Sequence, residues 1–184
     1  MSRTRNVFLT TAAATLLLSG AAFADVMVGG QQMLPSRNIV ENALNSADHT
    51  TLVAAVKAAG LVETLKGKGP FTVFAPVNAA FAALPAGTVE MLLKPENKDK
   101  LVHILANHVV PQRLTYAGLR HMIEQGHGKA GLKTVAGGYL TAAMNGPVNI
   151  VITDEMGGTA DISVYDVIQS NGVIFSVDRV LLPN

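Results

Sequence analysis

The sequence predicts an α+β fold, with helices in the first half of the chain and strands in the second half. Between residues 36 and 125, apolar residues recur every three or four positions and are interrupted by glycine and proline, which is typical of short amphipathic helices. From Leu132 onward, short runs rich in β-branched residues alternate with turn residues such as Gly137-Gly138. Helices followed by strands favour a largely non-parallel sheet with helices packed around it.

The stretch 71–85 joins the two kinds of structure. Residues 71–75 are aromatic and β-branched, which predicts a buried strand, and Pro76 should end that strand because it has no backbone N–H. Asn78 is expected to cap a helix whose apolar residues lie three apart on one face. We expect substitutions in this stretch to damage the whole fold.

The remaining elements follow from caps, breakers and periodicity. The expected helices are one capped by Ser36, one from Asp48 or Thr50 to Gly60, a turn at 61–66, one capped by Thr88, one from Asn97 to His108 and one at 115–125. The expected extended segments are 109–111, 132–136, 139–144, 148–153, 160–168 and 173–182, with a two-residue hairpin turn at Gly137-Gly138.

The N-terminal residues read as a secretory signal peptide. Arg3 and Arg5 precede an apolar run at 7–18, and Ala22-Phe23-Ala24 fits a small-x-small cleavage site. We expect Sec-type export, cleavage after Ala24 and a periplasmic or extracellular protein without a transmembrane anchor. Residues 25–35 are interpreted as a flexible lead-in, and 36–184 as a single domain.

The composition of the mature chain excludes some function classes. Cleavage leaves 184 − 24 = 160 residues with 12 basic and 13 acidic side chains, a net charge near −1. No basic patch stands out and aromatic residues are few, so nucleic-acid binding has no support. The chain has no cysteine, and a domain of this size buries roughly 70% of its unfolded surface, so it needs no disulfide or metal to be stable.

Three motifs resemble those of the fasciclin (FAS1) family. Residues 71–85 resemble its first signature, and residues 171–183 resemble its C-terminal signature. Asn107-His108 stands where the family usually has a Tyr-His pair. The resemblance spans residues 37–183 and implies a twisted β-wedge of mostly non-parallel strands with several helices packed around one edge. It also implies a role in adhesion or interaction.

The same resemblance suggests candidate partner-binding residues. The family's Tyr-His position points to Asn107 and His108, although Asn107 replaces the aromatic residue. The segment 97–101 resembles an integrin-contacting peptide of some animal fasciclins but lies far upstream of that peptide's place, and it is better explained as a helix start. The positional equivalent ends in Tyr165, Asp166, Val167 and Ile168.

Each candidate also has a structural explanation. His108 fits a partly buried histidine with one ring nitrogen bonded to the backbone, and Asp166 fits an acid that accepts hydrogen bonds from nearby turn amides. His103 and His108 are five apart, which is a poor spacing for a metal pair on a helix. Asp154, Glu155 and Asp161 lack the calcium-loop pattern and are interpreted as a solvated loop.

We therefore expect no metal, no cofactor and no catalytic site. No G-x-S-x-G elbow or acid pair marks an enzyme. The leading hypothesis is a secreted, non-enzymatic interaction module that binds an unidentified protein or cell-surface component, in adhesion, surface attachment or host association. The alternative is a carrier of a small, carotenoid-like apolar ligand, for which an apolar pocket of several hundred cubic ångströms is the expected sign.

Overall fold

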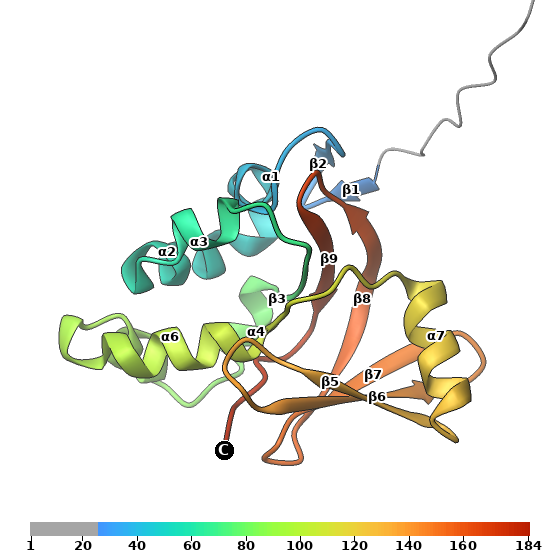
Figure 1. The fold of residues 1–184 in the computed structure, drawn as a ribbon. Coiled ribbons are helices and arrows are strands. Elements are labelled where there is room, and N and C mark those ends of the chain that lie inside the picture. The colour runs from blue at the N-terminus through green and yellow to red at the C-terminus, as the bar shows by residue number, and fades with distance from the viewer. Residues whose placement is uncertain (1–25) are drawn as a thin grey trace, which may run out of the picture.

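A computed structural model describes residues 26–184, which form a seven-stranded sheet with helices on both sides of it and a separate two-stranded hairpin (Figure 1). The proposed signal peptide and its cleavage site lie outside the described residues. The main sheet has seven strands in the order β4-β3-β9-β8-β7-β6-β5. Only β3 and β9 pair in parallel, and every other neighbouring pair is antiparallel. The strands are β3 (Phe71–Pro76), β4 (Val109–Val110), β5 (Lys129–Lys133), β6 (Tyr139–Asn145), β7 (Asn149–Thr153), β8 (Thr159–Ile168) and β9 (Gly172–Val177).

The helices precede most of the strands, so the predicted α+β class and the largely non-parallel sheet are confirmed. Figure 1 shows α2, α3 and α6 on one side of the central strands, while α7 lies against β5 and β6 on the other. The helices are α1 (Ile39–Asn45), α2 (Thr50–Ala59), α3 (Val62–Lys66), α4 (Asn78–Ala82), α5 (Thr88–Leu92), α6 (Lys98–Asn107) and α7 (Tyr116–Gln125), with 3-10 turns η1 (Ala47–His49) and η2 (Pro95–Asn97).

The central strands β3 and β9 separate two hydrophobic cores. Side chains alternate along a strand, so neighbouring residues face opposite sides of the sheet. Val73 and Ile174 belong to the core under α1–α6, whereas Phe74 and Phe175 stack in the core shared with β5–β7 and α7. All six residues of β9 are buried, because both of its faces are covered.

The segment expected to be a flexible lead-in forms a small hairpin instead. Strand β1 (Val26–Val28) pairs antiparallel with β2 (Gln31–Met33). Val28 and Met33 are buried in the core under α1–α6, and this burial of apolar surface explains why the segment is ordered.

Several helix starts differ from the predicted ones. Asn38, not Ser36, caps α1, and it forms a capping box with Glu41. Asn78 begins α4 but does not cap it: its side chain accepts from the Thr51 amide and donates to the Ala47 carbonyl. Thr115 caps α7 by accepting a hydrogen bond from the Gly118 amide.

Two further predicted features are corrected. Gly87, whose backbone is in the left-handed region, is the N-cap residue of α5, whereas the sequence predicted that Thr88 would be the cap. Strand β5 begins at Lys129 and pairs with β6 through Lys133 and Tyr139, so the turn is five residues long and not the two-residue turn expected at Gly137-Gly138. The sequence therefore predicted the position of this turn correctly but not its length.

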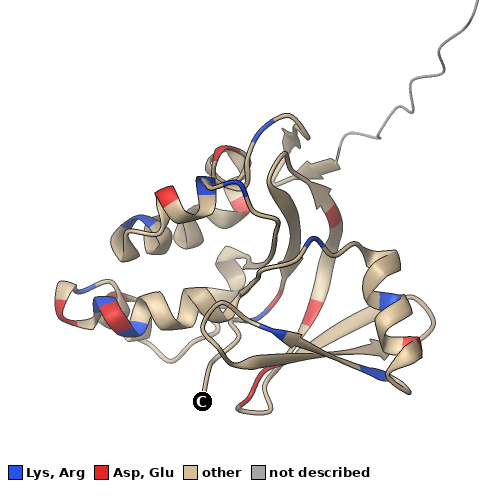
Figure 2. Cartoon of the chain, viewed as in Figure 1, with Lys and Arg blue, Asp and Glu red and all other residues tan. Residues whose placement is uncertain are grey.

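Charged residues are dispersed over helices, loops and the strands β5 and β8 (Figure 2). Both signs alternate at the start of α6, where Lys98, Asp99 and Lys100 follow one another. Among the ion pairs within the described part of the chain are two exposed pairs inside single helices, Lys66–Glu63 and Arg120–Glu124. Exposed pairs of this kind contribute little to stability, so the fold depends on its two cores.

Candidate functional site

His108 connects α6 to the C-terminal segment. Its Nδ1 lies 2.8 Å from the Ile104 carbonyl oxygen, one turn back in α6, and its Nε2 lies 2.9 Å from the Leu181 amide nitrogen. A carbonyl only accepts and an amide N–H only donates, so Nδ1 carries the proton and Nε2 accepts. The side chain is 2% exposed, and burial lowers the pKa of His108 to about 4 against the opposing influences of the Ile104 carbonyl and Asp154. His108 is therefore a neutral structural link.

Asn107 is also inside the protein. Its side chain is completely buried, its Oδ1 lies 3.3 Å from the Thr134 hydroxyl oxygen, and its Nδ2 has no hydrogen-bond partner in the described part of the chain. The partner-binding interpretation of Asn107 and His108 does not fit this burial, because neither side chain reaches the surface. The structural interpretation of His108 fits the observed contacts. The prediction was a partly buried ring with one backbone hydrogen bond, whereas the ring is enclosed and both of its nitrogens bond to the backbone.

Residues Tyr165–Ile168 lie at a bulge in β8. Val164 pairs with Ser176 and Val167 pairs with Ile174, so between these two pairs β8 advances by three residues and β9 by two. The bulge sends Val167 into the core under α1–α6 and leaves Tyr165 and Ile168 against the other core. Val167 is 1% exposed and cannot contact a partner, whereas Tyr165, Asp166 and Ile168 are half-buried.

Asp166 positions the start of α7. Its backbone has a φ of +52°, in the left-handed region, and its Oδ1 accepts a 2.7 Å hydrogen bond from the amide of Tyr116, the first residue of α7. The prediction that Asp166 bonds backbone amides is correct, but the amide belongs to α7 and not to the turn at 170–172. A carboxylate near the first turn of a helix also interacts favourably with the positive end of the helix dipole.

Tyr165 belongs to an aromatic cluster beside Asp166. Its ring packs edge-to-face on Tyr116 and Phe175, with ring centroids 5.1 and 6.1 Å apart. Its hydroxyl accepts from the Ile150 amide, and partial burial raises the pKa of Tyr165. These contacts fix β8, β7 and α7 relative to one another.

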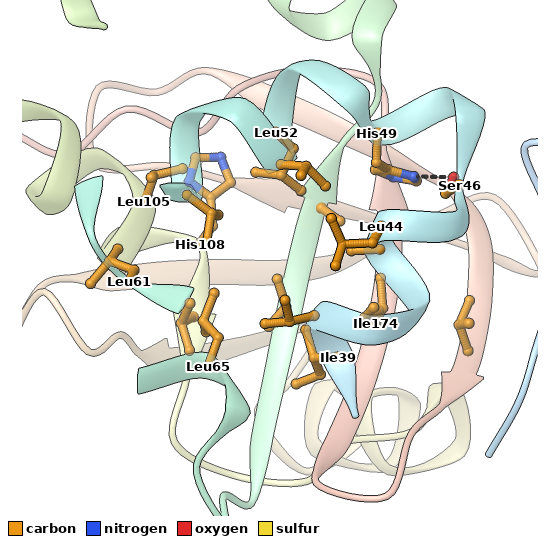
Figure 3. A pocket seen from close by; sticks show the side chains of 18 of the residues that line it. Ile39, Leu44, Ser46, His49, Leu52, Leu61, Leu65, Leu105, His108 and Ile174 are labelled. Atoms are coloured by element: carbon orange, nitrogen blue, oxygen red, sulfur yellow. Dashed lines mark hydrogen bonds between the residues drawn. The ribbon is translucent and has the colours of Figure 1, made fainter. Parts of the chain in front are cut away.

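A largely apolar cavity lies between the helices and the central strands. Figure 3 shows side chains from α1, α2 and α3, among them Ile39, Leu52 and Leu65, converging on Ile174 of β9. The cavity volume is about 120 Å³. Among residues 26–184, the cavity-lining atoms His49 Nε2 and Ser176 Oγ have no partner at hydrogen-bond geometry, although the Ala75 carbonyl raises the pKa of His49 against the larger, lowering influence of burial. Sequence reasoning missed this cavity.

A wider groove opens on the other side of α6. It has a volume of about 490 Å³ and is bounded by α4, α5, α6, the C-terminal segment and the β7–β8 turn. Met91, Met156 and Leu182 line it and are 42%, 64% and 37% exposed. Lys100 and His103 of α6 are the basic residues in its wall. Leu105 and His108 line both the groove and the cavity, so these side chains lie between the two.

Asp154 and Glu155 hold the C-terminal wall of the groove. Asp154 is buried, its Oδ1 accepts from the amides of Met156 and Gly158, and its Oδ2 accepts from the Leu182 amide at 2.8 Å. Glu155 accepts from the Asn184 amide. The interpretation of this acidic loop as purely solvated is wrong for Asp154, which fixes the turn that carries Met156.

The structure gives no direct sign of a metal site or a membrane span. Within residues 26–184, no three histidine or acidic side chains lie close enough together to hold a metal ion. In the same range, every helix is too short or too polar to cross a membrane.

Taken together, the helices and the seven-stranded sheet define a wedge-shaped α+β domain. The Fasciclin domain family matches residues 47–183, and the chain belongs to this family. It is 51% identical over 146 residues to Protein sll1483 of Synechocystis sp., covering 79% of this chain and 73% of that protein.

More distant relatives extend the comparison. The transforming growth factor-beta-induced protein ig-h3 of Sus scrofa is 36% identical over 132 residues, which cover 72% of this chain and 17% of that longer protein. A FAS1 domain pair from the insect cell adhesion molecule Fasciclin I superposes with a TM-score of 0.62 at 18% identity, covering 86% of this chain and 57% of that chain. The expected FAS1 fold is thus confirmed.

Proposed function

We propose that the protein is an exported, non-enzymatic interaction module that acts in adhesion or surface attachment. Family membership supports a binding role, since a solved relative comes from a cell adhesion molecule. The observation that carries the proposal is the groove beside α6, which exposes three large apolar side chains, Met91, Met156 and Leu182, around one depression. Clustered exposed apolar surface of this kind marks interaction sites more often than scattered single residues do.

The groove is suited to a protein partner because its walls combine rigid and adaptable groups. Its floor includes the buried residues Leu92, Leu101 and Ile104, whereas flexible methionines stand at its rim. Methionine adjusts to different apolar shapes, which is common at binding surfaces. Lys100 and His103 add hydrogen-bond donors at the edge of the apolar area.

A pair of matched methionine variants tests the proposal. Met156→Ser removes an apolar side chain from the groove rim, and Met27→Ser removes a similarly exposed one, 57% exposed, from β1 away from the groove. Each variant gene is introduced into source cells from which the native gene has been deleted. We expect Met156→Ser, but not Met27→Ser, to reduce the attachment of these cells to surfaces. Equal attachment by both variants and by the deletion strain would refute the module hypothesis.

Part of the segment that the family resemblance indicates remains a candidate contact. Tyr165, Asp166 and Ile168 are half-buried, and we propose them as a second, smaller contact area. Substitution of Ile168 by serine tests this area in the same attachment assay, with thermal unfolding as the control because the Ile168 side chain also packs against the core shared with β5–β7 and α7.

The second candidate function is a carrier of a small apolar ligand. The specific observation in its favour is the size of the groove, about 490 Å³, with mostly apolar walls. Binding sites for drug-sized molecules fall in the range of roughly 300–1,000 Å³. A carrier purified from its natural source would retain its bound ligand, whereas an interaction module would be isolated without one.

Native mass spectrometry with an absorption spectrum separates the two functions. On protein purified from its own source, a reproducible extra mass that is lost on denaturation, or a visible absorption band, would favour the carrier. A bare chain beginning at Asp25 would favour the interaction module and would also establish export and the cleavage site.

A further inference from the structure

Two of the exposed sulfur atoms of the chain lie at one groove. The full sequence has seven methionines and neither cysteine nor tryptophan, so methionine is its only sulfur-containing residue type. Of the six methionines that the structure describes, Met27, Met91 and Met156 are 57%, 42% and 64% exposed. Met91 and Met156 line the groove beside α6, whereas Met27 lies on β1. A reagent that reaches exposed thioethers therefore acts twice at this groove.

The other three described methionines are shielded. Met33 is 4% exposed in the core under α1–α6, and Met122 and Met144 are half-buried against the core shared with β5–β7 and α7. An oxidant in water meets a thioether sulfur only where the side chain is accessible, so these three should react more slowly. Exposure thus separates a fast group of three methionines from a slow group of three.

Hydrogen bonds hold the backbone of Met156 at the rim of the groove. Met156 lies in the turn between β7 and β8, where its amide donates to Asp154 Oδ1 at 3.0 Å. The other oxygen of this buried carboxylate accepts from the Leu182 amide, so Asp154 fixes two of the exposed rim residues together. The Met156 side chain is accessible in this arrangement, and no opening motion is needed for an oxidant to reach it.

Met91 reaches the same groove from α5. Its carbonyl accepts a 2.7 Å hydrogen bond from Asn97 Nδ2, which ties the end of α5 to the 3-10 turn before α6. The next residue, Leu92, is buried in the core under α1–α6 and anchors the short helix. The two methionines thus come from elements far apart in the chain and border one depression.

Oxidation replaces the apolar thioether of methionine with a polar group. The sulfur lone pair attacks one oxygen of hydrogen peroxide, the O–O bond breaks, and the proton on the attacked oxygen passes to the leaving hydroxide, which departs as water. The sulfur is oxidised by two electrons and the peroxide is reduced by two. Methionine sulfoxide reductases reverse the change, with a dithiol oxidised to a disulfide and the oxygen released as water.

We propose that Met91 and Met156 form a reversible oxidation site through which hydrogen peroxide controls the groove beside α6. In the thioether state the rim of the groove is apolar and binds its partner, and in the sulfoxide state the rim is polar and binds weakly. The effect on attachment rests on the interaction role proposed above for this groove. The oxidation itself and the loss of exposed apolar surface do not depend on that role.

Leucine variants test the site without a known partner. Leucine is apolar and similar in volume to methionine but has no sulfur, so Met91→Leu/Met156→Leu blocks oxidation at the groove. Met27→Leu is the matched control, because it removes an exposed sulfur away from the groove. Each folded protein is treated with hydrogen peroxide. Peptide mass spectrometry then locates the added oxygen atoms, and hydrophobic-interaction chromatography on a phenyl column measures the change in exposed apolar surface.

In the wild type, we expect the three exposed methionines to gain one oxygen each before the three shielded ones do. Retention on the phenyl column should fall, and most of this fall should persist in Met27→Leu but disappear in Met91→Leu/Met156→Leu. Sulfoxide reductases of both epimer specificities, supplied with a dithiol, should restore the mass and the retention. Equal oxidation rates in the two groups, an equal loss of retention in the double variant, or a failure of the reductases would each overturn the proposal.

A separate measurement connects the site with attachment. Beads that carry the purified protein are treated with peroxide, washed and applied to source cells. Treated wild type and treated Met27→Leu should bind as poorly as Met156→Ser, whereas Met91→Leu/Met156→Leu should bind equally before and after treatment. Equal binding by untreated wild type and Met156→Ser would refute the function proposed for the groove. If these two differ but peroxide leaves the wild type unchanged, the oxidation control is refuted instead.

Discussion

A single histidine at the family's Tyr-His position shows how a motif residue can be structural. His108 holds α6 to the C-terminal segment through two backbone hydrogen bonds, one to Ile104 and one from Leu181. Both bonds require the neutral ring with its proton on Nδ1. Protonation of Nε2 would place two donors against each other, which ties the link to pH.

The first prediction concerns acid stability. The unfolded chain protonates His108 with a pKa near 6.5, whereas the folded pKa is about 4. The unfolded state therefore binds more protons as the pH falls from 6.5 to 4, and the free energy of unfolding should fall by about 3 kcal/mol over that interval from this residue. Above pH 6.5 the contribution is complete. Urea unfolding at a series of pH values measures it.

Two histidine variants separate this effect from general acid denaturation. His108→Gln should be less stable at pH 7 but should lose less stability between pH 6.5 and 4 than the wild type. His103→Gln changes an exposed residue of α6 and should leave the wild-type pH profile intact. An unaltered profile in His108→Gln would contradict the assignment.

The second prediction concerns Asp166, where a left-handed backbone and a helix-start hydrogen bond coincide. Asp166→Asn keeps an acceptor oxygen and tolerates the φ of +52°, whereas Asp166→Ala does neither. The alanine variant should lose about 1–3 kcal/mol and the asparagine variant less than half of that. Thermal or urea unfolding measures both losses. Equal losses in the two variants would contradict a role for the left-handed backbone and for the hydrogen bond to the Tyr116 amide.

At the scale of elements, Asn171 in the β8–β9 turn fastens two helices to the sheet. Its Oδ1 accepts from the amide of Ile39 at the start of α1, and its Nδ2 donates to the carbonyls of Leu65 and Gly67 at the end of α3. The three bonds join segments more than 100 residues apart in the chain. They position α1 and α3, two of the helices that line the cavity.

The third prediction follows from these bonds. Asn171→Ala removes three partners from backbone groups near the core, and we expect a loss of about 2–4 kcal/mol in the free energy of unfolding. Ser170→Ala, next to it but exposed, should change stability by less than ~0.5 kcal/mol. A silent Asn171→Ala would contradict the fastening role.

Elements could be predicted from the sequence where their signals are local. Strand β3 with its stop at Pro76 and the helix expected at 115–125 depend on residues within a few positions of one another. The β1–β2 hairpin was not predictable, because its order depends on burial of Val28 and Met33 against distant helices. Asn78 looked like a cap, but its side chain bonds to residues 47 and 51 instead.

The candidate site was harder to predict than the fold for the same reason. His108 and Asp166 were identified from the family motifs, and their hydrogen bonds to backbone groups follow from residue chemistry. The cavity beside His49 and the groove beside α6 are each lined by several elements from distant parts of the chain. No periodicity or spacing within a single segment could indicate either of them.

At the scale of the whole molecule, the two cores lie on opposite faces of the central strands. Strands β3 and β9 bury residues on both faces, whereas the β1–β2 hairpin contributes two buried apolar residues, Val28 and Met33. The fourth prediction is that backbone amides of β3 and β9 exchange with solvent only on global unfolding, while those of β1 and β2 exchange much faster. Hydrogen exchange followed by mass spectrometry measures both, and rapid exchange in β9 would contradict the shared-core description.

The parallel pairing of β3 with β9 has a consequence for synthesis. Phe71 aligns with Gly172, so about one hundred residues are made between the two partners of this ladder. A ribosome-bound chain that has not yet released residues 172–177 lacks the strand that completes both cores. The domain consequently reaches its native state only after nearly all of its residues have been translated, and until then it stays in a form that chaperones and proteases can engage.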